Sequence, residues 1–536
     1  MIESGRLRYV VLVGLLVSVT ALTCQSQSLW DLANENKELL KISTLFTAQN
    51  VRDYLSTEEG INEAVKWCKE TGVTHVFIET YRSRYTAERE TLQRAKSRFE
   101  VEGFEVSGCV TTTQVGKIST GWNLISCYTD RQTQNELQKI FEYTASIFDE
   151  IMIDDFLFTD CQCEDCKKAR GEETWADYRC DLMVKVSRER ILQPAKAVNP
   201  DVKIIIKYPQ WYDSFHNRGY EVSRETADYD KIWVGTETRD YDDKRWGGKV
   251  QYEAYYIMRW LGAIGGRKTG GGWFDPLGTT EDTYVEQARQ TILAGASEML
   301  LFCYGALLRN TGPANVRKLR TEIPGLFELA RLVRNKPIKG VLAPKPPNSD
   351  AYDEQYVFDF VGMLGLPLVP TAEIRTDAEA AFFSVHALKE PSFAGKLKEM
   401  LDAEKPVLIT DGLAKRLNSV NTDDENLTVL KVGGNPRSLL KLTRRQLNPI
   451  RRKLLAPFGM RFDAPNKVGL YFVGENCLIV ENFNDEPIDA SLEFSKAVTA
   501  RKTLVLPPEG NVELSWGLRK VKFAKITPRT LVAVEY

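Results

Sequence analysis

The sequence predicts an α/β chain that begins with a (β/α)8 TIM barrel, continues into a small flavodoxin-like α/β domain and ends in a β-sandwich. Strand-like apolar runs alternate with helix-like amphipathic runs over residues 38–335. The pattern becomes a shorter α/β alternation over 336–454, and closely spaced strand-like runs fill 455–536. At 536 residues the chain is too long for one core, so we expect three domains behind an N-terminal signal over 1–24.

Eight strand-like runs supply the predicted barrel. Each is short and rich in apolar residues, and a helix-like run follows it. Eight such units match a (β/α)8 barrel, which typically takes ~250 residues before insertions. The alternative is an open, doubly wound sheet, but the first strand-helix junction has no Gly-rich phosphate turn. The strand-like runs are 41–51, 73–81, 104–112, 151–153, 202–208, 231–238, 268–274 and 298–304.

Two smaller domains follow a Pro- and Lys-rich stretch at 336–346. Helix-like and strand-like runs alternate in the first of them, which predicts a small α/β domain at 356–366, 380–385, 393–403 and 406–410. The last domain contains only short strand-like runs, which predicts the β-sandwich. These runs are 467–472, 477–483, 490–494, 502–506, 511–516 and 530–536.

The N-terminus has the pattern of an export signal. Arg6 and Arg8 precede an apolar run at 9–16, which is shorter than a membrane span. Cys24 stands near the position of a bacterial lipoprotein cleavage site, although Thr23 replaces the small residue usual there. We therefore expect export, either with a lipid anchor through Cys24 or after cleavage of a plain signal peptide. The product would be periplasmic, on the cell surface or secreted.

The charge balance argues against nucleic-acid binding. The chain has 71 Lys and Arg against 73 Asp and Glu, a net charge of -2, and no basic stretch stands out. We also expect no organic cofactor.

The strongest chemical signal follows the fourth predicted strand. The apolar run 151–153 leads into the adjacent carboxylates Asp154 and Asp155, and then into three closely spaced cysteines. In a barrel, the reacting groups come from the carboxyl ends of the strands. Because side chains alternate along a strand, we expect one of the two aspartates to line the pocket and the other to make a supporting contact.

Carboxylates, aromatic rings and cationic groups also end the other predicted strands, which is typical of a carbohydrate site. Hydrolysis of a glycoside needs one carboxyl group to protonate the leaving oxygen and another to attack the sugar or activate water. Asp155 and Glu237 are the leading catalytic pair, Asp275 is the main rival of Glu237, and Asp154 is the remaining candidate. The residues expected to bind substrate are Glu79, Arg82, Tyr208, Trp211, Arg239, Trp273 and Tyr304.

Other functions remain open on the sequence. Adjacent aspartates also resemble those of hexosaminidases, in which one carboxylate orients the acetamido group of the substrate and the other is the acid. A carbohydrate-binding barrel without turnover would carry the same residues. A metal-dependent deacetylase is disfavoured, because His75, His216 and His386 are too scattered to build an open metal site.

The C-x-C-x-x-C run of Cys161, Cys163 and Cys166 offers three thiolates to a structural zinc ion, which needs a fourth ligand. Cys127, in the loop after the third strand, is the predicted fourth, and Cys180 is its competitor. Such a closed site would brace the loop behind the aspartates. The alternative is one or two disulfides among the same thiols, which export would permit.

With these residues in place, the chain resembles the β-galactosidases of glycoside hydrolase family forty-two and related barrel hydrolases. In that family an acid ends the fourth strand, a C-x-C-x-x-C run follows, and an earlier cysteine completes a zinc site. The resemblance implies that Asp155 is the acid, that Cys127 completes the zinc site, and that 336–454 is a trimerisation-like domain able to form a homo-oligomer.

The chain departs from that family at two positions. It has Asp154-Asp155 where the family has asparagine followed by glutamate, and its seventh strand offers only Asp275 as a carboxylate. Carboxylates on strands four and six, as in α-galactosidase-like enzymes, are therefore an alternative arrangement.

Overall fold

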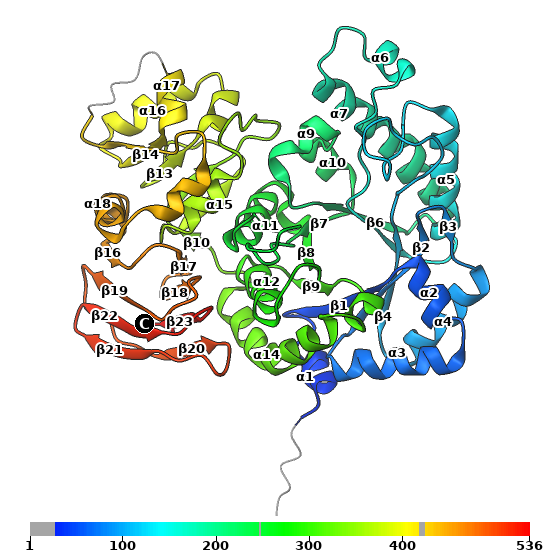
Figure 1. Cartoon of the computed structure of the whole chain (residues 1–536), viewed down its shortest axis with the longest axis horizontal. Helices are drawn as coiled ribbons and strands as arrows, with labels where there is room; N and C mark the ends of the chain where they lie inside the picture. Colours follow the sequence, from blue (N-terminus) through cyan, green and yellow to red (C-terminus); the bar gives the residue numbers. More distant parts are fainter. Residues whose placement is uncertain (1–26, 246–247, 418–423) are drawn as a thin grey trace, which may run out of the picture.

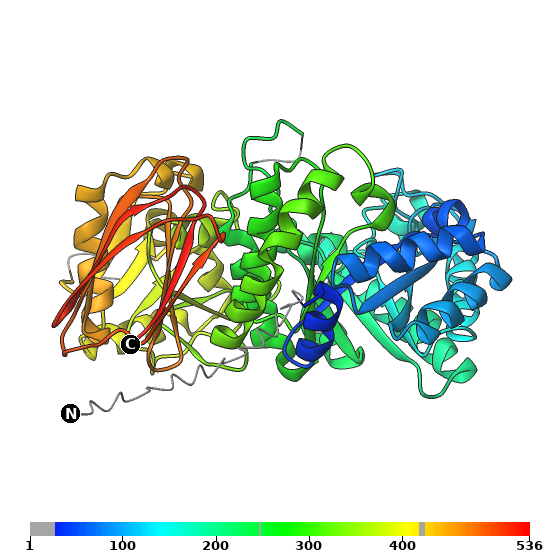
Figure 2. The same ribbon diagram turned by 90° about the horizontal axis from the view of Figure 1, so that it is seen from below.

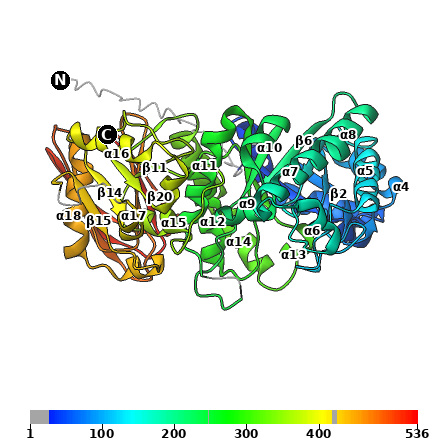
Figure 3. The same cartoon turned by 90° about the horizontal axis from the view of Figure 1, so that it is seen from above.

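The computed structural model describes residues 27–245, 248–417 and 424–536. A barrel forms one side of the molecule, and the later residues form two further parts beside it (Figures 1, 2 and 3). The predicted signal, with Cys24, lies outside the described residues. Within the described ranges, no helix is both long enough and apolar enough to cross a membrane.

The predicted barrel is confirmed. Eight parallel strands form a closed ring, because the first strand pairs with both the second and the last. A short strand, β3 (Tyr85–Thr86), pairs antiparallel with the end of the second barrel strand. The barrel strands are β1 (Lys41–Phe46), β2 (His75–Arg82), β4 (Glu105–Val110), β5 (Glu150–Ile153), β6 (Lys203–Tyr208), β7 (Lys231–Gly235), β8 (Thr269–Phe274) and β9 (Glu298–Leu301).

Helices follow the barrel strands, and those on its outside pack against it through apolar side chains. In α3 (Glu58–Glu70), the buried residues Ile61, Ala64, Val65 and Cys68 follow helical spacing, and Thr57 caps the first turn. The other covering helices are α2 (Ala48–Tyr54), α4 (Arg89–Val101), α5 (Arg131–Ala145), α6 (Glu164–Arg170), α7 (Trp175–Val186), α8 (Gln193–Val198), α10 (Val222–Asp228), α11 (Tyr252–Gly265), α12 (Glu281–Leu293) and α14 (Gly312–Val333).

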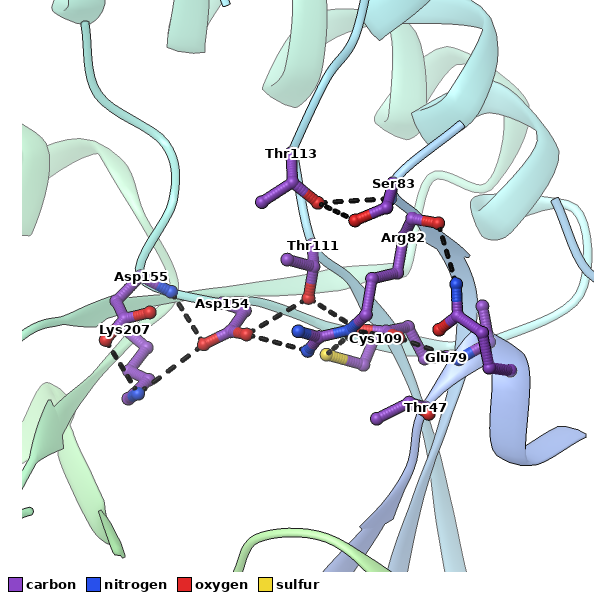
Figure 4. A network of polar contacts seen from close by, with 12 residues as sticks. Thr47, Glu79, Arg82, Ser83, Cys109, Thr111, Thr113, Asp154, Asp155 and Lys207 are labelled. Atoms are coloured by element: carbon purple, nitrogen blue, oxygen red, sulfur yellow. Dashed lines mark hydrogen bonds and ion pairs between the residues drawn. The ribbon is translucent and has the colours of Figure 1, made fainter. Parts of the chain in front are cut away.

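The barrel interior has an apolar layer below a polar one. Because side chains alternate along a strand, every second residue points inward. The inward residues of the apolar layer include Leu45, Phe77, Cys109, Met152 and Ile205. Two positions closer to the carboxyl end, the same strands lead to Thr47, Glu79, Thr111, Asp154 and Lys207, which gather at the mouth of the barrel (Figure 4).

The second part contains a five-stranded parallel sheet with the order β12-β11-β13-β14-β15. This is the strand order of flavodoxin-like doubly wound sheets. The sequence prediction included only two of its strands. The elements are β11 (Val341–Pro344), α15 (Val357–Gly362), β12 (Leu368–Thr371), β13 (Ala381–Phe383), α16 (Phe393–Asp402), β14 (Val407–Thr410), α17 (Asp411–Arg416), β15 (Leu427–Leu430) and α18 (Arg444–Leu455).

The last part consists of two antiparallel sheets that share one apolar core. Arg529 and Lys502 tie these sheets to the barrel helices through Glu286 of α12 and Glu328 of α14. The sequence prediction did not include β22, where lysines occupy exposed positions between buried apolar ones. The strands are β10 (Ile338–Lys339), β16 (Met460–Asp463), β17 (Val468–Val473), β18 (Cys477–Asn482), β19 (Ile488–Phe494), β20 (Lys502–Leu506), β21 (Glu513–Gly517), β22 (Lys520–Ile526) and β23 (Leu531–Glu535).

A buried charged contact joins the barrel to the second part. Asp213, in the loop after β6, lies 2.9 Å from His386 Nε2 and 3.8 Å from Lys345 Nζ, and it accepts a hydrogen bond from the Tyr356 amide. Burial alone would raise the pKa of Asp213, but His386, Lys345 and the Tyr356 amide outweigh it and lower the pKa. The carboxylate is therefore held in its charged form against the second part.

We predict that Asp213→Asn destabilises the protein strongly, because the buried Lys345 ammonium would lose its counter-charge. Breaking such a buried pair should lower the free energy of unfolding by about 3–5 kcal/mol in urea titration. Asp350→Asn is the control: Asp350 pairs with His216, but its side chain is 62% exposed, so the loss should be about 0–1 kcal/mol. Equal losses in the two variants would contradict the role given to Asp213.

Candidate active site

Lys207 stands at the centre of the polar layer. It is the inward residue at the carboxyl end of β6, and its side chain is 1% exposed. Its Nζ atom donates to Asp155 Oδ2 at 3.0 Å, to Glu237 Oε1 at 2.9 Å and to Asp154 Oδ1 at 3.4 Å. The same ammonium lies 4.1 Å from the ring centroid of Trp273, which forms the floor beneath it. One cation thus gathers three carboxylates from the loops after β5 and β7.

A second cation extends this network toward β2 (Figure 4). Arg82 donates to Asp154 Oδ2 at 2.9 Å and to Glu79 Oε2 at 2.8 Å. Glu79 also accepts hydrogen bonds from the Ala48 amide and from the Thr111 hydroxyl. Glu79 is fully buried, so it holds Arg82 and Thr111 in place and is not itself open to solvent.

The two adjacent aspartates have opposite pKa shifts. Burial alone would raise the pKa of Asp154, but Lys207, Arg82 and the Asp155 amide outweigh it and lower the pKa to about 2. For Asp155, burial and the negative charges of Asp154 and Glu237 outweigh the attraction of Lys207 and raise the pKa to about 8. At neutral pH the pair therefore holds one carboxylate and one carboxylic acid.

Both aspartates contact Lys207, which differs from the expectation that only one would line the pocket. The physical reason is that β5 ends at Ile153, so Asp155 lies on a loop where strand alternation no longer applies. Asp154 is buried, whereas the Asp155 side chain is 16% exposed at the mouth. Asp155 is therefore the one of the pair that solvent and substrate can reach.

Glu237 has one bound and one unbound oxygen. Its Oε1 accepts from Lys207, whereas its Oε2 is buried and has no hydrogen-bond partner among the described residues. Gly235, at the end of β7, leaves room for this carboxylate, since a Cβ there would lie 2.5 Å from Oε2. A buried carboxylate oxygen without a partner is rare in native structures and is found at functional sites.

Asp275 is engaged differently. Arg239 forms a bidentate pair with it, with Nε 3.1 Å from Oδ1 and Nη2 2.7 Å from Oδ2. Asp275 Oδ1 also accepts from the Leu277 amide. Arg239 has a left-handed backbone, with φ 58°, which is uncommon for a residue with a side chain and occurs often at functional sites.

Of the other residues expected to bind substrate, two tryptophans lie at the site and two tyrosines lie away from it. Trp273 lies beneath Lys207, and Trp211 packs against Phe158 at the rim, with ring centroids 5.1 Å apart. Tyr208 does not line the site, because it is the outward neighbour of Lys207 and contacts Thr226 of α10. Tyr304 does not line it either, since it packs among Phe46, Tyr54 and Trp67.

Lys207 is the main residue of the site that the sequence prediction left without a role. A signal was present in the strand KIIIKY: its second lysine, Lys207, comes two positions after Ile205 and therefore faces the barrel interior as Ile205 does. A charged residue at an inward position of a buried strand needs partners of opposite charge.

The four predicted cysteines come together. Cys127, Cys161, Cys163 and Cys166 place their sulfur atoms within 4.8 Å of one another, and this cluster could hold a metal ion. Sγ of Cys127 lies 3.5 Å from Cys166 and 3.8 Å from Cys163, and Sγ of Cys163 lies 3.7 Å from Cys166. These distances exceed the ~2.05 Å of a disulfide bond. Cys180 is not part of the cluster, because its thiol contacts the carbonyl of His216.

Groups around the cysteines would support thiolate ligands. Lys117 Nζ lies 3.5 Å from the sulfur of Cys163, and the Thr129 hydroxyl lies 3.0 Å from that of Cys166. Four thiolates around a divalent ion carry excess negative charge, which a nearby ammonium and hydroxyl donors offset.

A Ser-His-Asp arrangement also exists, away from the barrel mouth. His386 lies between Ser384 Oγ, 2.8 Å from Nδ1, and Asp213 Oδ1, 2.9 Å from Nε2. All three side chains are buried at the junction described above. We therefore assign this arrangement to the junction of the two parts and not to catalysis.

Comparisons with known structures agree with the fold. An α-L-fucosidase, isoenzyme 2 from Paenibacillus thiaminolyticus, superposes with a TM-score of 0.60 at 10% identity, covering 93% of this chain and 99% of that one. A catalytic mutant of a GH42 β-galactosidase from G. stearothermophilus also gives a TM-score of 0.60 at 10% identity, covering 92% and 98%. At this identity the similarity establishes the fold alone.

Sequence comparison gives the family. An uncharacterized protein of Saccharolobus solfataricus is 26% identical over 436 residues, which is 73% of this chain and 69% of that protein. The family model described as "probable glycosyl hydrolase, catalytic domain" matches residues 27–352, which include the whole barrel and the site around Lys207. The chain therefore belongs to this family of probable glycosyl hydrolases.

Proposed function

We propose that this protein hydrolyses O-glycosidic bonds at the mouth of the barrel, with Asp155 as the proton donor and Glu237 as the nucleophile. The observation that carries the proposal is the shared contact with Lys207, whose Nζ lies 3.0 Å from Asp155 Oδ2 and 2.9 Å from Glu237 Oε1. The two carboxyl groups thereby face one another, and they differ in their hydrogen-bonding.

The difference suits the two roles that glycoside hydrolysis requires. The raised pKa of Asp155, about 8, keeps a proton on this side chain at neutral pH. Burial alone would lower the pKa of Lys207, but Asp155, Glu237 and Asp154 outweigh it and raise the pKa. The charged ammonium holds Glu237 Oε1 beside Asp155, and Glu237 is the carboxyl group assigned to the attack.

The reaction follows from these protonation states. A carboxyl oxygen of Glu237 forms a bond to the anomeric carbon as the bond to the leaving oxygen breaks, and Asp155 transfers its proton to that oxygen. Asp155, now a carboxylate, removes a proton from a water molecule, whose oxygen displaces Glu237 and restores both side chains.

The separation of the pair supports retention of configuration. Asp155 Oδ2 and Glu237 Oε1 both lie within 3.0 Å of Lys207 Nζ, so these two oxygens are no more than about 6 Å apart. This upper limit is nearer to the carboxyl separation of retaining enzymes, ~5–5.5 Å, than to that of inverting enzymes, ~6.5–9.5 Å. The first sugar released should therefore have the anomeric configuration of the substrate.

The contacts of the other two carboxylates disfavour them as reacting groups. Asp154 already accepts from Arg82, Thr111, Lys207 and the Asp155 amide, so little capacity remains to orient an acetamido group as in the hexosaminidase alternative. Asp275 is occupied by the bidentate pair with Arg239. We assign Arg82 and Arg239, each partly exposed, to hydrogen bonds with sugar hydroxyls.

We further propose that the cysteine cluster binds a structural zinc ion. A tetrahedral Zn²⁺ with Zn–S bonds of ~2.3 Å separates its sulfur ligands by ~3.8 Å. The sulfur-sulfur distances of 3.5, 3.7 and 3.8 Å fit this geometry. Four thiolates leave no open position for a catalytic water, so the ion would brace the loops that carry Cys127 and Cys161.

We predict that Asp155→Asn and Glu237→Gln each lower kcat at least roughly 10²-fold on 4-nitrophenyl glycosides, because each removes one of the two reacting groups. A panel of glycosides of galactose, glucose, mannose, xylose, fucose and arabinose in both anomers would identify the substrate. Proton NMR of the same reactions would report the anomer that is released first.

Two comparisons make this test specific. Asp149→Asn is the control, because this carboxylate is 81% exposed at the opposite end of β5. A 2,4-dinitrophenolate leaving group needs no proton, so Asp155→Asn should recover much of its kcat/KM on such substrates, because kcat/KM reports the first step, whereas Glu237→Gln should not. Full activity in both variants would refute the assignment, and glycan binding without cleavage would favour the non-catalytic alternative.

We predict that kcat/KM decreases as the pH rises through about 8, because the proton donor must be protonated and the pKa of Asp155 is about 8. The measurement is a pH profile on a glycoside whose leaving group needs a proton. On a 2,4-dinitrophenyl glycoside the alkaline decrease should weaken. A profile that is flat from pH 6 to pH 10 would exclude Asp155 as the acid.

We predict one zinc ion per chain by elemental mass spectrometry of the purified protein. Cys127→Ser should lose the metal, because the cluster would lose one of its four thiolates, whereas Cys180→Ser should retain it. Metal-free protein with Cys161, Cys163 and Cys166 in disulfides by non-reducing peptide mapping would replace the zinc proposal.

A further inference from the structure

An aromatic surface lies beside Asp155. It consists of Trp122, Phe156, Phe158 and Trp211, here called the aromatic platform. Trp122 is 43% exposed, and its ring centroid lies 5.7 Å from that of Phe156 and 6.3 Å from that of Phe158. The Trp122 and Phe158 rings are nearly parallel, with an angle of 28° between them. The indole therefore packs against both phenyl rings, while Trp122 as a whole remains exposed.

The platform belongs to the same rim of the barrel as the catalytic pair. Trp122 lies in the loop after β4, Phe156 and Phe158 in the loop after β5, and Trp211 in the loop after β6. In a barrel these loops follow one another around the carboxyl-terminal face. Phe156 is the residue directly after Asp155, so the platform begins at the proposed proton donor.

Asp160 holds the platform in position. Its carboxylate accepts from the Ser119 hydroxyl at 2.5 Å, from the Trp122 amide at 2.9 Å and from Arg218 at 2.7 Å. Gly121 allows this close approach, since a Cβ there would lie 2.5 Å from Asp160 Cγ. Asp160 thus fixes the backbone that carries the Trp122 indole. A surface that is already ordered loses less conformational entropy when a ligand binds.

The polar and apolar surfaces of the mouth divide around Asp155. Lys207, Arg82, Arg239 and the carboxylates provide charged donors and acceptors on the side of the barrel axis. On the side of the platform, Trp122 is exposed, and Phe156 and Trp211 are half-buried. An acid that donates its proton to the leaving oxygen stands between the sugar that is attacked and the group that departs.

We propose that the aromatic platform binds the departing part of the substrate, as a pyranose ring stacked on the exposed indole of Trp122. This inference rests on the proposed function and adds to it a substrate class: glycosides whose leaving group is itself a sugar, hence disaccharides and longer oligosaccharides. The apolar face of a pyranose loses water against the indole, and the edges of the same sugar keep their hydroxyls in solvent.

The test compares leaving groups at a constant glycone, taken from the panel above. The glycosyl fluoride places only a fluoride ion on the platform side, whereas the disaccharide with the same glycone linked to glucose places a sugar ring there. Trp122→Ala should lower the ratio of kcat/KM for the disaccharide to that for the fluoride by about tenfold. Trp122→Phe, which keeps a flat ring, should restore most of the ratio.

Leu518→Ala is the control for removing an exposed apolar side chain, because Leu518 is 73% exposed in the last part of the chain; its ratio should equal that of the unchanged protein. A ratio that is the same in Trp122→Ala as in the unchanged protein would overturn the proposal. So would a change of oligomeric state in Trp122→Ala by light scattering, since the platform would then be a contact between two copies of the chain.

A second measurement separates this proposal from the proposed function. Asp155→Asn protein, with and without Trp122→Ala, is applied to an array of mono-, di- and trisaccharides. If the unchanged protein cleaves no glycoside, the proposed hydrolysis fails, but a selective loss of di- and trisaccharide binding with Trp122→Ala would still support the platform. Equal loss for monosaccharides and longer glycans would overturn it.

Discussion

The buried ammonium of Lys207 is the interaction on which the site depends. Asp154, Asp155 and Glu237 all contact it, and two of these three side chains are almost fully buried. Carboxylates taken out of water at such short range would repel one another by several kcal/mol without a cation between them. One positive charge cannot neutralise three negative ones, and the raised pKa of Asp155 indicates that the excess is relieved by keeping a proton there.

The charge states of Asp154 and Asp155 depend on which residues end the neighbouring barrel strands. Arg82 and Lys207 both approach Asp154, so Asp154 stays charged while its neighbour in the sequence keeps its proton. The second cation therefore acts on Asp155 indirectly, by fixing a negative charge beside it. Glu79 also acts on Asp155 indirectly, because it orients Arg82, which in turn contacts Asp154. The protonation state of Asp155 thus depends on residues that lie in or just after β2, β5, β6 and β7.

The sequence predicted those features that arise from local patterns. Alternating apolar runs are enough to identify a barrel, and the place of Cys127 in the loop after the neighbouring strand predicted that it would join the other three cysteines. The direction of individual side chains was harder to predict from the sequence. Lys207 and Tyr208 are neighbours, and only the register of the strand decides which one faces inward. For Asp155 the deciding fact was where β5 ends. The partners of Glu79 come from residues up to 32 positions away, and no spacing in the sequence indicates them.

The loop after β5 connects the two chemical features of the chain. Asp155 begins this loop, Phe156 and Phe158 follow, and Asp160 and Cys161 tie it to the loop after β4. A catalytic acid needs a fixed position, since small displacements of a reacting group slow the chemistry severely. A loop of this length with few backbone hydrogen bonds would not give that rigidity alone. The cysteine cluster and Asp160 supply it from the outer end, and Lys207 supplies it from the inner end, so Asp155, the proposed acid, is held from both sides.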